Sequence, residues 1–315
     1  MKTLAGIRHL TGLALALTVL SACAGTPVSD RLTAQTPNGL PQQVELSETP
    51  FFAQTENYCG PAAMAPALNA SGLDTSPDEL GETLFTPGRE GTLQSDVITS
   101  ARRQGRLALP VTGIEPAFRT LAAGRPVMIL QNLALEMAPQ WHYALLIGYD
   151  LPAKTAILRS GETQRLEMPL ETLEHTWRRG DFWGVVLVEP EGPVPPTVSS
   201  SQWIAEAAGL ERAGQASAAE TAYRTALREW PDAALAWIAI ANQHYGAGRL
   251  GESEAALRRA VALEPENGAA WNNLAQVLFE RGDRTGAAEA VDEALSLDGS
   301  HLEAARRTRD RIKGS

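Results

Sequence analysis

A single cysteine, Cys59, stands where a polar segment meets an apolar, helix-forming one in "QTENYCGPAAMAPALNA", residues 54–70. Proline fits the first turn of a helix, because its missing N–H would have had no helical partner there, so Pro61 places Cys59 at a helix N-terminus. The positive end of the helix dipole stabilises a thiolate and lowers the pKa of a thiol. Gly60 adds no side chain beside the sulfur, which would let a substrate approach closely. Cys59 is therefore a candidate nucleophile, the alternative being a small buried core residue.

A thiolate nucleophile needs a histidine that forms an ion pair with it and protonates the leaving group. Of the five histidines, His9 lies in the apolar leader, His175 in an amphipathic segment, and His244 and His301 in the C-terminal third. Only His142 opens an apolar, strand-like run, "WHYALLIGY". His142 is the candidate general acid/base, the alternative being a structural histidine.

Acyl transfer also needs a hydrogen-bond donor for the oxyanion close to the nucleophile. Gln54 lies five residues before Cys59 and carries an amide within reach of a short loop. Taken alone, Gln54 reads as a surface glutamine.

The sequence predicts neither a metal site nor a cofactor. It contains no HExxH motif, no paired CxxC motifs and no glycine run suited to phosphate. The 27 basic and 37 acidic residues give a net charge of −10. This balance argues against nucleic acid as a partner, and against anionic lipid recognised through bulk electrostatics.

The first 22 residues have the pattern of a secretory signal. Lys2 and Arg8 precede "LTGLALALTVL", an apolar run too short to span a bilayer comfortably. The following "LSAC", residues 20–23, resembles the lipobox of bacterial lipoproteins, which implies that Cys23 is acylated and becomes the mature N-terminus. An ordinary cleaved signal with a chance cysteine is the alternative.

The residues after Cys23 predict where the protein resides. Ala24 stands where the lipoprotein pattern has an aspartate in proteins kept at the inner membrane. The resemblance therefore implies the periplasmic face of the outer membrane, with the lipid as the only membrane contact. Residues 23–43 are small, polar and Pro-containing, which predicts a flexible tether.

The chain has only two cysteines. If Cys23 carries lipid, Cys59 has no intramolecular partner in a compartment that permits disulfides. An unpaired thiol in that setting is either buried in the core or has a chemical role as a reactive group.

"EPEGPVPPTVSS", residues 189–200, predicts a stiff linker between two unlike regions. Beyond it, tryptophan, glycine and alanine recur every 34 residues. This period resembles the tetratricopeptide repeat, a helix–turn–helix unit. The predicted repeats cover 201–303, as about 202–235, 236–269 and 270–303, followed by a capping helix or tail at 304–315. The resemblance implies an all-α solenoid whose groove takes a protein partner.

Residues 44–188 read as an α+β domain. Capping signals and Gly/Pro punctuation predict helices in "SPDELGETLF", "TLQSDVITSARRQG" and "EPAFRTLAAG". Apolar, β-branched runs then predict neighbouring strands in "PVMIL", "HYALLIGY", "TAILRS" and "FWGVVLVEP". Helices followed by a sheet indicate an α+β arrangement.

Together, these motifs resemble the bacteriocin-processing, double-glycine-type peptidase domains, which are papain-like cysteine peptidases. The resemblance covers roughly residues 44–188 and rests on "PFFAQTENYCGPAAMAPALNASG", "GRPVMILQN" and "WHYALLIGYD". It implies a papain-like α+β domain joined to the repeat solenoid. It also implies Gln54 as the oxyanion residue, Cys59 as the nucleophile and His142 as the general acid/base.

The sequence departs from this family at the third catalytic position, where the family has an aspartate at the end of the strand after that of the histidine. Asp150 cannot serve, since it lies eight residues beyond His142 on one strand, roughly 26 Å away. A hairpin turning at about 150–153 would bring 160–163 opposite His142, which places Ser160 at the aspartate position.

Two other residues could orient the imidazole in place of Ser160. Glu162 lies close to it in the sequence, and Asn132 ends the adjacent strand "PVMILQN". A serine has no negative charge that would stabilise an imidazolium. An enzyme with this departure would be slow, use a different third residue, or be inactive.

The sequence as a whole predicts a periplasmic lipoprotein that hydrolyses peptide bonds in a peptide or protein substrate, through a thioester on Cys59. The repeats would dock a protein partner or the substrate. The alternative is a catalytically degenerate adaptor that binds peptides on the same fold. A transferase or amidase acting on cell-wall material would use the same Cys–His pair.

Overall fold

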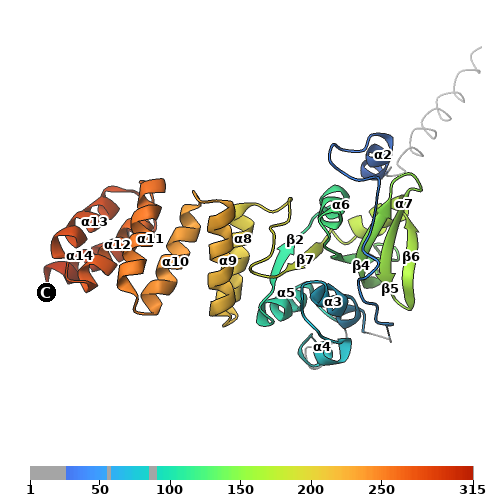
Figure 1. The fold of residues 1–315 in the computed structure, drawn as a ribbon, viewed down its shortest axis with the longest axis horizontal. Helices are drawn as coiled ribbons and strands as arrows, with labels where there is room; N and C mark the ends of the chain where they lie inside the picture. Colours follow the sequence, from blue (N-terminus) through green and yellow to red (C-terminus); the bar gives the residue numbers. More distant parts are fainter. Residues whose placement is uncertain (1–25, 55–57, 85–90, 315) are drawn as a thin grey trace, which may run out of the picture.

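The computed structural model describes residues 26–54, 58–84 and 91–314, leaving out the side chains of 82 and 83. It confirms the predicted order of an α+β domain followed by a helical repeat region (Figure 1). The predicted signal peptide, 1–22, and the predicted lipidation site, Cys23, lie outside the described residues. Within those ranges, no helix combines the length and apolar character needed to cross a membrane.

The α+β domain is built on a seven-stranded sheet in which every pairing is antiparallel. The strand order is β2-β7-β3-β4-β5-β6, and β1 pairs with the second half of β4. The strands are β1 (Gln43–Glu45), β2 (Leu107–Pro110), β3 (Val127–Asn132), β4 (Trp141–Asp150), β5 (Thr155–Ser160), β6 (Thr163–Pro169) and β7 (Gly184–Val188).

Helices cover both faces of this sheet (Figure 1). One face carries α3 (Cys59–Asn69), α4 (Pro77–Leu84) and α5 (Gln94–Arg103), and the other carries α2 (Pro27–Ala34), α6 (Ile114–Ala122) and α7 (Leu170–Arg178). Because successive strand residues alternate between faces, β4 serves two cores. Tyr143 and Leu145 pack in the cluster of α3, whereas Ala144 packs in the cluster of α6 and α7.

The predicted succession of helices and then strands is wrong in detail. Strand β2 precedes α6 and pairs with the last strand, so that Leu107 lies opposite Val188. Strands β1, β2 and β6 were not predicted. The first two are short, and β6 is a largely exposed edge strand with a polar sequence. These three strands form because neighbouring strands pair with them, and not because their own sequences contain a long apolar run.

The prediction of a flexible tether at 23–43 is wrong for residues 26–43. Residues 27–34 form α2, in which Leu32 is fully buried. The buried carboxylate of Glu174 on α7 accepts hydrogen bonds from the backbone N–H groups of Val28 (3.3 Å) and Ser29 (2.8 Å), and from the Ser29 hydroxyl (2.5 Å). A carboxylate at the first turn of a helix satisfies its orphan donors and favours its dipole. Composition alone could not reveal this long-range partner.

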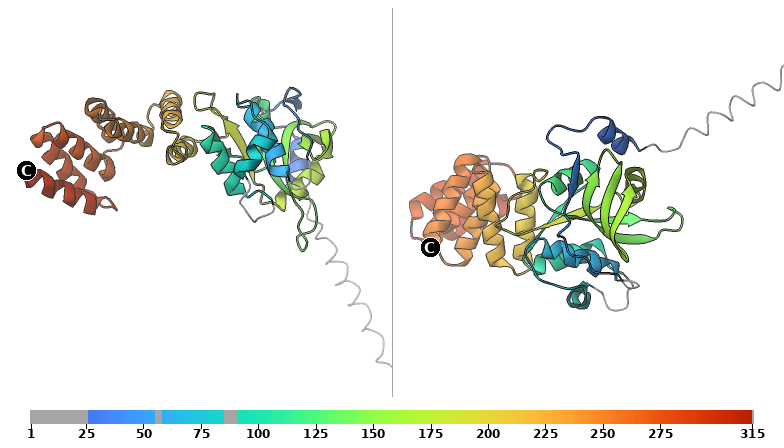
Figure 2. Two further views of the ribbon diagram at one scale, coloured as in Figure 1. Left: turned by 90° about the horizontal axis from the view of Figure 1, so that it is seen from below. Right: turned by 45° about the vertical axis from the view of Figure 1, so that its right-hand side comes forward.

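The repeat region contains two helices in each predicted unit. They are α8 (Ser200–Arg212), α9 (Ala216–Glu229), α10 (Ala234–Gly246), α11 (Leu250–Leu263), α12 (Gly268–Glu280) and α13 (Arg284–Ser296), and α14 (Leu302–Lys313) follows. The recurring glycines occupy the turns inside the units with positive φ, at +80°, +72° and +88° for Gly214, Gly248 and Gly282, which favours a residue without Cβ. Figure 2 shows the helices stacking in a row that leads away from the α+β domain.

The two regions on either side of residues 189–200 are in direct contact, although a stiff linker was expected to separate them. Arg102 on α5 forms a bidentate pair with Glu206 on α8, at 2.7 and 3.1 Å. Trp203 of α8 belongs to the same buried cluster as Leu107 and Val188 of the sheet. The first repeat therefore continues the core of the α+β domain.

Glu174→Ala should release α2 from the domain. Hydrogen bonds to a charged group are worth about 1.5–3 kcal/mol each and are not additive, so we expect a loss of about 2–3 kcal/mol in the free energy of unfolding. Hydrogen exchange at residues 27–34 should rise more than elsewhere. Glu171→Ala, on the same helix but with an exposed side chain, is the matched control, and equal effects of the two substitutions would contradict this role of Glu174.

Candidate active site

Cys59 is the first residue of α3, as the sequence predicted, and its thiol is free and half-buried. The helix that follows is almost entirely buried, from Gly60 to Leu68. Its N-terminus is therefore held firmly, with the dipole directed at the sulfur. This arrangement suits a nucleophile that must keep its position during attack.

The expectation that Gly60 leaves open space for a substrate is wrong. A Cβ at Gly60 would lie 2.2 Å from Oγ1 of Thr92, so a neighbouring side chain already fills that space. Glycine is required here because the segment before α5 packs against the first turn of α3.

The open space lies on another side of Cys59, in a cavity of about 410 Å³. Much of its wall is apolar. Burial, with a further contribution from the nearby Cys59, raises the pKa of the Tyr143 hydroxyl. The lining residues are Cys59, Gly91, Thr92, Leu93, Gln94, Leu130, Trp141, Tyr143, Gly180 and Asp181.

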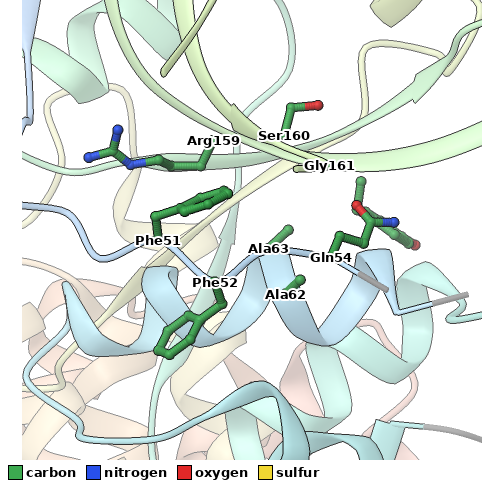
Figure 3. A pocket seen from close by; sticks show the side chains of 9 residues that line it. Phe51, Phe52, Gln54, Ala62, Ala63, Arg159, Ser160 and Gly161 are labelled. Carbon is green, nitrogen blue, oxygen red and sulfur yellow. The ribbon is translucent and has the colours of Figure 1, made fainter. Parts of the chain in front are cut away.

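Gln54 is attached to the far end of β5. Its backbone N–H donates to the carbonyl of Gly161 at 3.1 Å. Its side chain lines a small cavity of about 10 Å³, together with Ala62 of α3 and Ser160 (Figure 3). A space of this size holds about one water molecule. Gln54 and Cys59 thus approach the same end of the sheet, and Tyr143 lines both cavities.

His142 and Ser160 are brought together as the predicted hairpin required. The turn between β4 and β5 spans 151–154, and Leu145 pairs with Arg159. Nε2 of His142 lies 2.8 Å from the Ser160 hydroxyl oxygen. Because Nε2 is engaged there, Nδ1 is the ring nitrogen that this contact leaves open.

Asn132 and Glu162, the two alternatives to Ser160, do not take that place, and Asp150 is remote from the ring as expected. Asp150 pairs with Thr155 at the opposite end of the hairpin. The side-chain oxygen of Asn132 accepts from the backbone N–H groups of Ala134 (3.1 Å) and Gln140 (3.0 Å), so it holds the loop between β3 and β4. Glu162 is exposed in the turn after β5.

Cys59 and His142 lie at the same end of β4 but on opposite faces of the sheet. Trp141 and Tyr143, the two chain neighbours of His142, line the Cys59 cavity, whereas His142 belongs to the alternate set of β4 residues that faces α7. Since His142 is the second residue of the strand, its ring lies at the end of the sheet. No hydrogen bond joins it to the Cys59 thiol in the part of the chain that the structure describes. Such contacts often tighten only when a substrate is bound.

The strand alternation of "WHYALLIGY" could have shown that Trp141 and Tyr143 share the α3 face. The remaining cavity residues come from separate loops, before α5 and after α7, and no local pattern marks them.

The environment of His142 favours the neutral imidazole. Burial lowers the pKa of His142 from its usual value of 6.5. The hydroxyl of Ser160 carries no charge that would offset this effect. Within 26–54, 58–84 and 91–314, no cluster of three or more His, Cys, Asp or Glu side chains is arranged to hold a metal.

Comparison with known proteins separates the chain into two recognisable parts. Residues 46–181 match the Peptidase_C39 like family, and residues 238–301 match the Tetratricopeptide repeat. No curated protein matches the chain.

Several solved structures resemble one part or the other. A C39-like peptidase from Bacillus anthracis is 20% identical, with a TM-score of 0.40, and the match covers 47% of this chain and 98% of that chain. The TPR2B domain of yeast Sti1, in its complex with pHsp70, is 17% identical, with a TM-score of 0.35 and coverage of 36% and 96%. The Sgt2 TPR domain from Aspergillus fumigatus is 23% identical, with a TM-score of 0.35 and coverage of 39% and 83%.

His142 should make the protein less stable in acid. Its folded-state pKa lies below that of the unfolded chain, so unfolding takes up a proton as the pH falls below about 6.5, and stability declines. His142→Gln lacks this proton uptake and should therefore lose less unfolding free energy between pH 7.5 and pH 5 than the wild type does. Urea unfolding at both pH values measures the difference. His244→Gln, in the repeats, is the control, and parallel pH profiles of wild type and His142→Gln would contradict the prediction.

Proposed function

Because residues 46–181 form a domain of the Peptidase_C39 like family and repeats follow it, we propose that the protein is a cysteine peptidase. Cys59 is the nucleophile and His142 the general acid/base. The observation that carries the proposal is the 2.8 Å contact between Nε2 of His142 and Ser160. This contact orients a histidine whose two chain neighbours both line the cavity of a thiol at a helix N-terminus.

In the first half of the reaction, Nδ1 of His142 takes the thiol proton while the sulfur of Cys59 attacks the peptide carbonyl carbon. The negative charge moves to the carbonyl oxygen, where the side-chain amide of Gln54 and the backbone N–H of Cys59 are the donors. The C–N bond then breaks, and His142 returns its proton to the departing amine. A thioester on Cys59 remains.

In the second half, His142 takes a proton from water while the water oxygen attacks the thioester carbon. The C–S bond breaks, the carboxylic acid leaves and the thiol is restored. Ser160 keeps the ring in position through both halves, but it offers no charge to the imidazolium. We expect turnover to be slower than a carboxylate at this position would allow.

The cavity beside Cys59 supports a peptide substrate, since Leu93, Leu130 and Trp141 offer apolar contact next to the attacking sulfur. The repeats support docking of a protein partner or of the rest of the substrate, because stacked repeats present an extended concave surface. Their attachment through the Arg102–Glu206 pair keeps that surface at a set position relative to the site.

A second candidate function is a peptide-binding adaptor on an inactive peptidase fold. The neutral Ser160 and the lowered pKa of His142 favour it. The two functions differ in whether Cys59 is needed for partner capture. A transferase or amidase acting on cell-wall material would use the same pair of residues and would differ only in its acceptor.

Cys59→Ala and His142→Ala should each abolish hydrolysis of a peptide library, with losses of at least 100-fold, because each removes a group required for acyl transfer. Mass spectrometry of the cleaved peptides and of the thioester on Cys59 measures both. In wild type, iodoacetamide should alkylate Cys59 at pH 7 at least ten times faster than in His142→Ala.

His175→Ala, on α7, is the control and should leave both measurements unchanged. Equal alkylation of wild type and His142→Ala, with no cleavage by either, would reject the peptidase. Retained peptide binding by Cys59→Ala in that case would establish the adaptor.

We also propose that the protein is a lipoprotein of the cell envelope, acylated on Cys23 and facing the periplasm from the outer membrane. The "LSAC" motif and the apolar leader support this proposal. Only three residues separate Cys23 from α2, a reach of roughly 14 Å at full extension, and α2 is docked on the α+β domain. The lipid would therefore hold the α2 and α7 end of the domain against the membrane.

Cys23→Ser should abolish labelling of the chain by radioactive palmitate in a bacterial host and move the protein from the membrane fraction to the soluble fraction. Cys59→Ser, which changes the other cysteine, should keep both the label and the membrane location. Palmitate labelling that persists in Cys23→Ser would contradict the proposal.

A further inference from the structure

Arg159, the residue before Ser160 on β5, is a buried arginine that forms no ion pair within the described part of the chain. The carboxylate of Glu45 on the adjoining β1 binds Arg165 instead, at 2.8 and 2.9 Å. A charged group that is removed from water needs hydrogen bonds to compensate for its lost hydration. The guanidinium group of Arg159 finds this compensation in the backbone.

The side chain of Arg159 donates to backbone carbonyl oxygens of two separate segments. Nε and Nη2 donate to the oxygen of Thr49 at 3.2 and 2.8 Å, and Nη2 also donates to the oxygen of Ser47 at 2.9 Å. Nη1 donates to the oxygen of Gln164 on β6. The planar fork of an arginine suits several acceptors at fixed positions. Arg159 therefore holds the segment that follows β1 against the end of β5.

Arg159 belongs to the face of the sheet that carries α3. It pairs with Leu145 of β4, which packs in the cluster of α3, and paired residues of antiparallel strands project from the same face. Cys59 packs against this cluster as well. The next residue along β5, Ser160, contacts His142. The end of β5 thus carries one residue for the histidine and one for the face on which the thiol lies.

The segment that Arg159 holds leads directly to Gln54, which follows Thr49 by five residues. The backbone N–H of Gln54 donates to the carbonyl of Gly161 at 3.1 Å. Between these two attachments, Phe51 lines the cavity of about 10 Å³ together with Arg159 and Gln54 (Figure 3). The segment is therefore attached to the end of β5 at two points, and Gln54 lies at the second.

The bond between Gln54 and Gly161 is too weak to fix Gln54 without the first attachment. A single hydrogen bond between neutral backbone groups contributes about as much as ordering one residue costs in backbone entropy. Hydrogen bonds from a charged group are stronger, and Arg159 makes three of them to this segment. A donor for an oxyanion is effective only when its position is fixed before the charge develops.

We propose that Arg159 is a positioning residue for the oxyanion donor, because its guanidinium group holds residues 47–49 on β5 and so sets where the amide of Gln54 lies. Ser160 and Gly161 follow Arg159 directly, so one strand end places both the acid/base and the oxyanion donor. The proposal deepens the peptidase assignment and rests on it, since Gln54 has this task only where an oxyanion forms.

The test is a double-mutant cycle in the full chain, with the peptide of the library that the wild type cleaves best. Gln54→Ala should lower kcat about 100-fold. Arg159→Met removes the donors and keeps most of the length. It should lower kcat about tenfold and change KM by less than about twofold, because an oxyanion donor acts only in the transition state. In the Gln54→Ala background, Arg159→Met should lower kcat by less than about twofold, since the group that it positions is absent.

Hydrogen exchange measured at residues 50–54 is a readout that needs no turnover. It should rise at least about tenfold in Arg159→Met, because the segment loses its charged attachment. Arg125→Met is the matched control, since Arg125 is 8% exposed against 6% for Arg159 and binds Glu189 before the other end of β3. This variant should lose stability but keep both kcat and the exchange rate at 50–54.

Equal losses of kcat from Arg159→Met in the two backgrounds, or unchanged exchange at 50–54, would overturn the role of Arg159 and show a purely structural arginine. Where Arg159→Met does not fold, Arg159→Lys replaces it with the same expected pattern, since a single ammonium group lacks the fork that spans the two segments. A wild type that cleaves no peptide would reject the peptidase and the task of Gln54. Raised exchange in the variant would then leave Arg159 only as an attachment of the segment.

Discussion

The backbone pairing of β4 with β3 and β5 is the constraint on which the site depends. It places Gln131 directly opposite His142 and, through the β4–β5 hairpin, brings Ser160 within hydrogen-bond distance of the same ring. Strand alternation then directs Trp141 and Tyr143 to the other face, where they line the cavity of Cys59. A slip of one residue in this register would exchange the two sets of side chains. The positions of His142 and of the cavity wall are thus consequences of a single pairing.

The environment of His142 differs from that of a histidine held by a carboxylate. Burial lowers its pKa, and its hydrogen-bond partner is neutral. Both features favour the uncharged imidazole, whereas a carboxylate in place of Ser160 would favour the imidazolium.

The α+β domain is joined to both of its neighbouring segments by buried contacts. Glu174 holds α2 through three hydrogen bonds, and Trp203 of the first repeat packs in the same core as β2 and β7. The repeats and the Cys59 cavity consequently belong to one structural unit. Under the proposed function, a partner bound by the repeats would hold its free segments at a defined distance from the thiol, which raises their effective concentration there.

Local patterns in the sequence determined the elements that depend on neighbouring residues. Pro61 after Cys59 predicted the start of α3, the 34-residue period predicted the paired helices, and the length of the hairpin placed Ser160 against His142. Contacts between distant residues decided the rest. Hydrogen bonds to Glu174 dock α2, which lies in a segment predicted to be a flexible tether. The side chain of Thr92 fills the space beside Gly60, and the side chain of Asn132 accepts hydrogen bonds from the loop between β3 and β4. Hydrogen bonds and packing of this kind join residues far apart in the chain, so no local pattern of residue types encodes them.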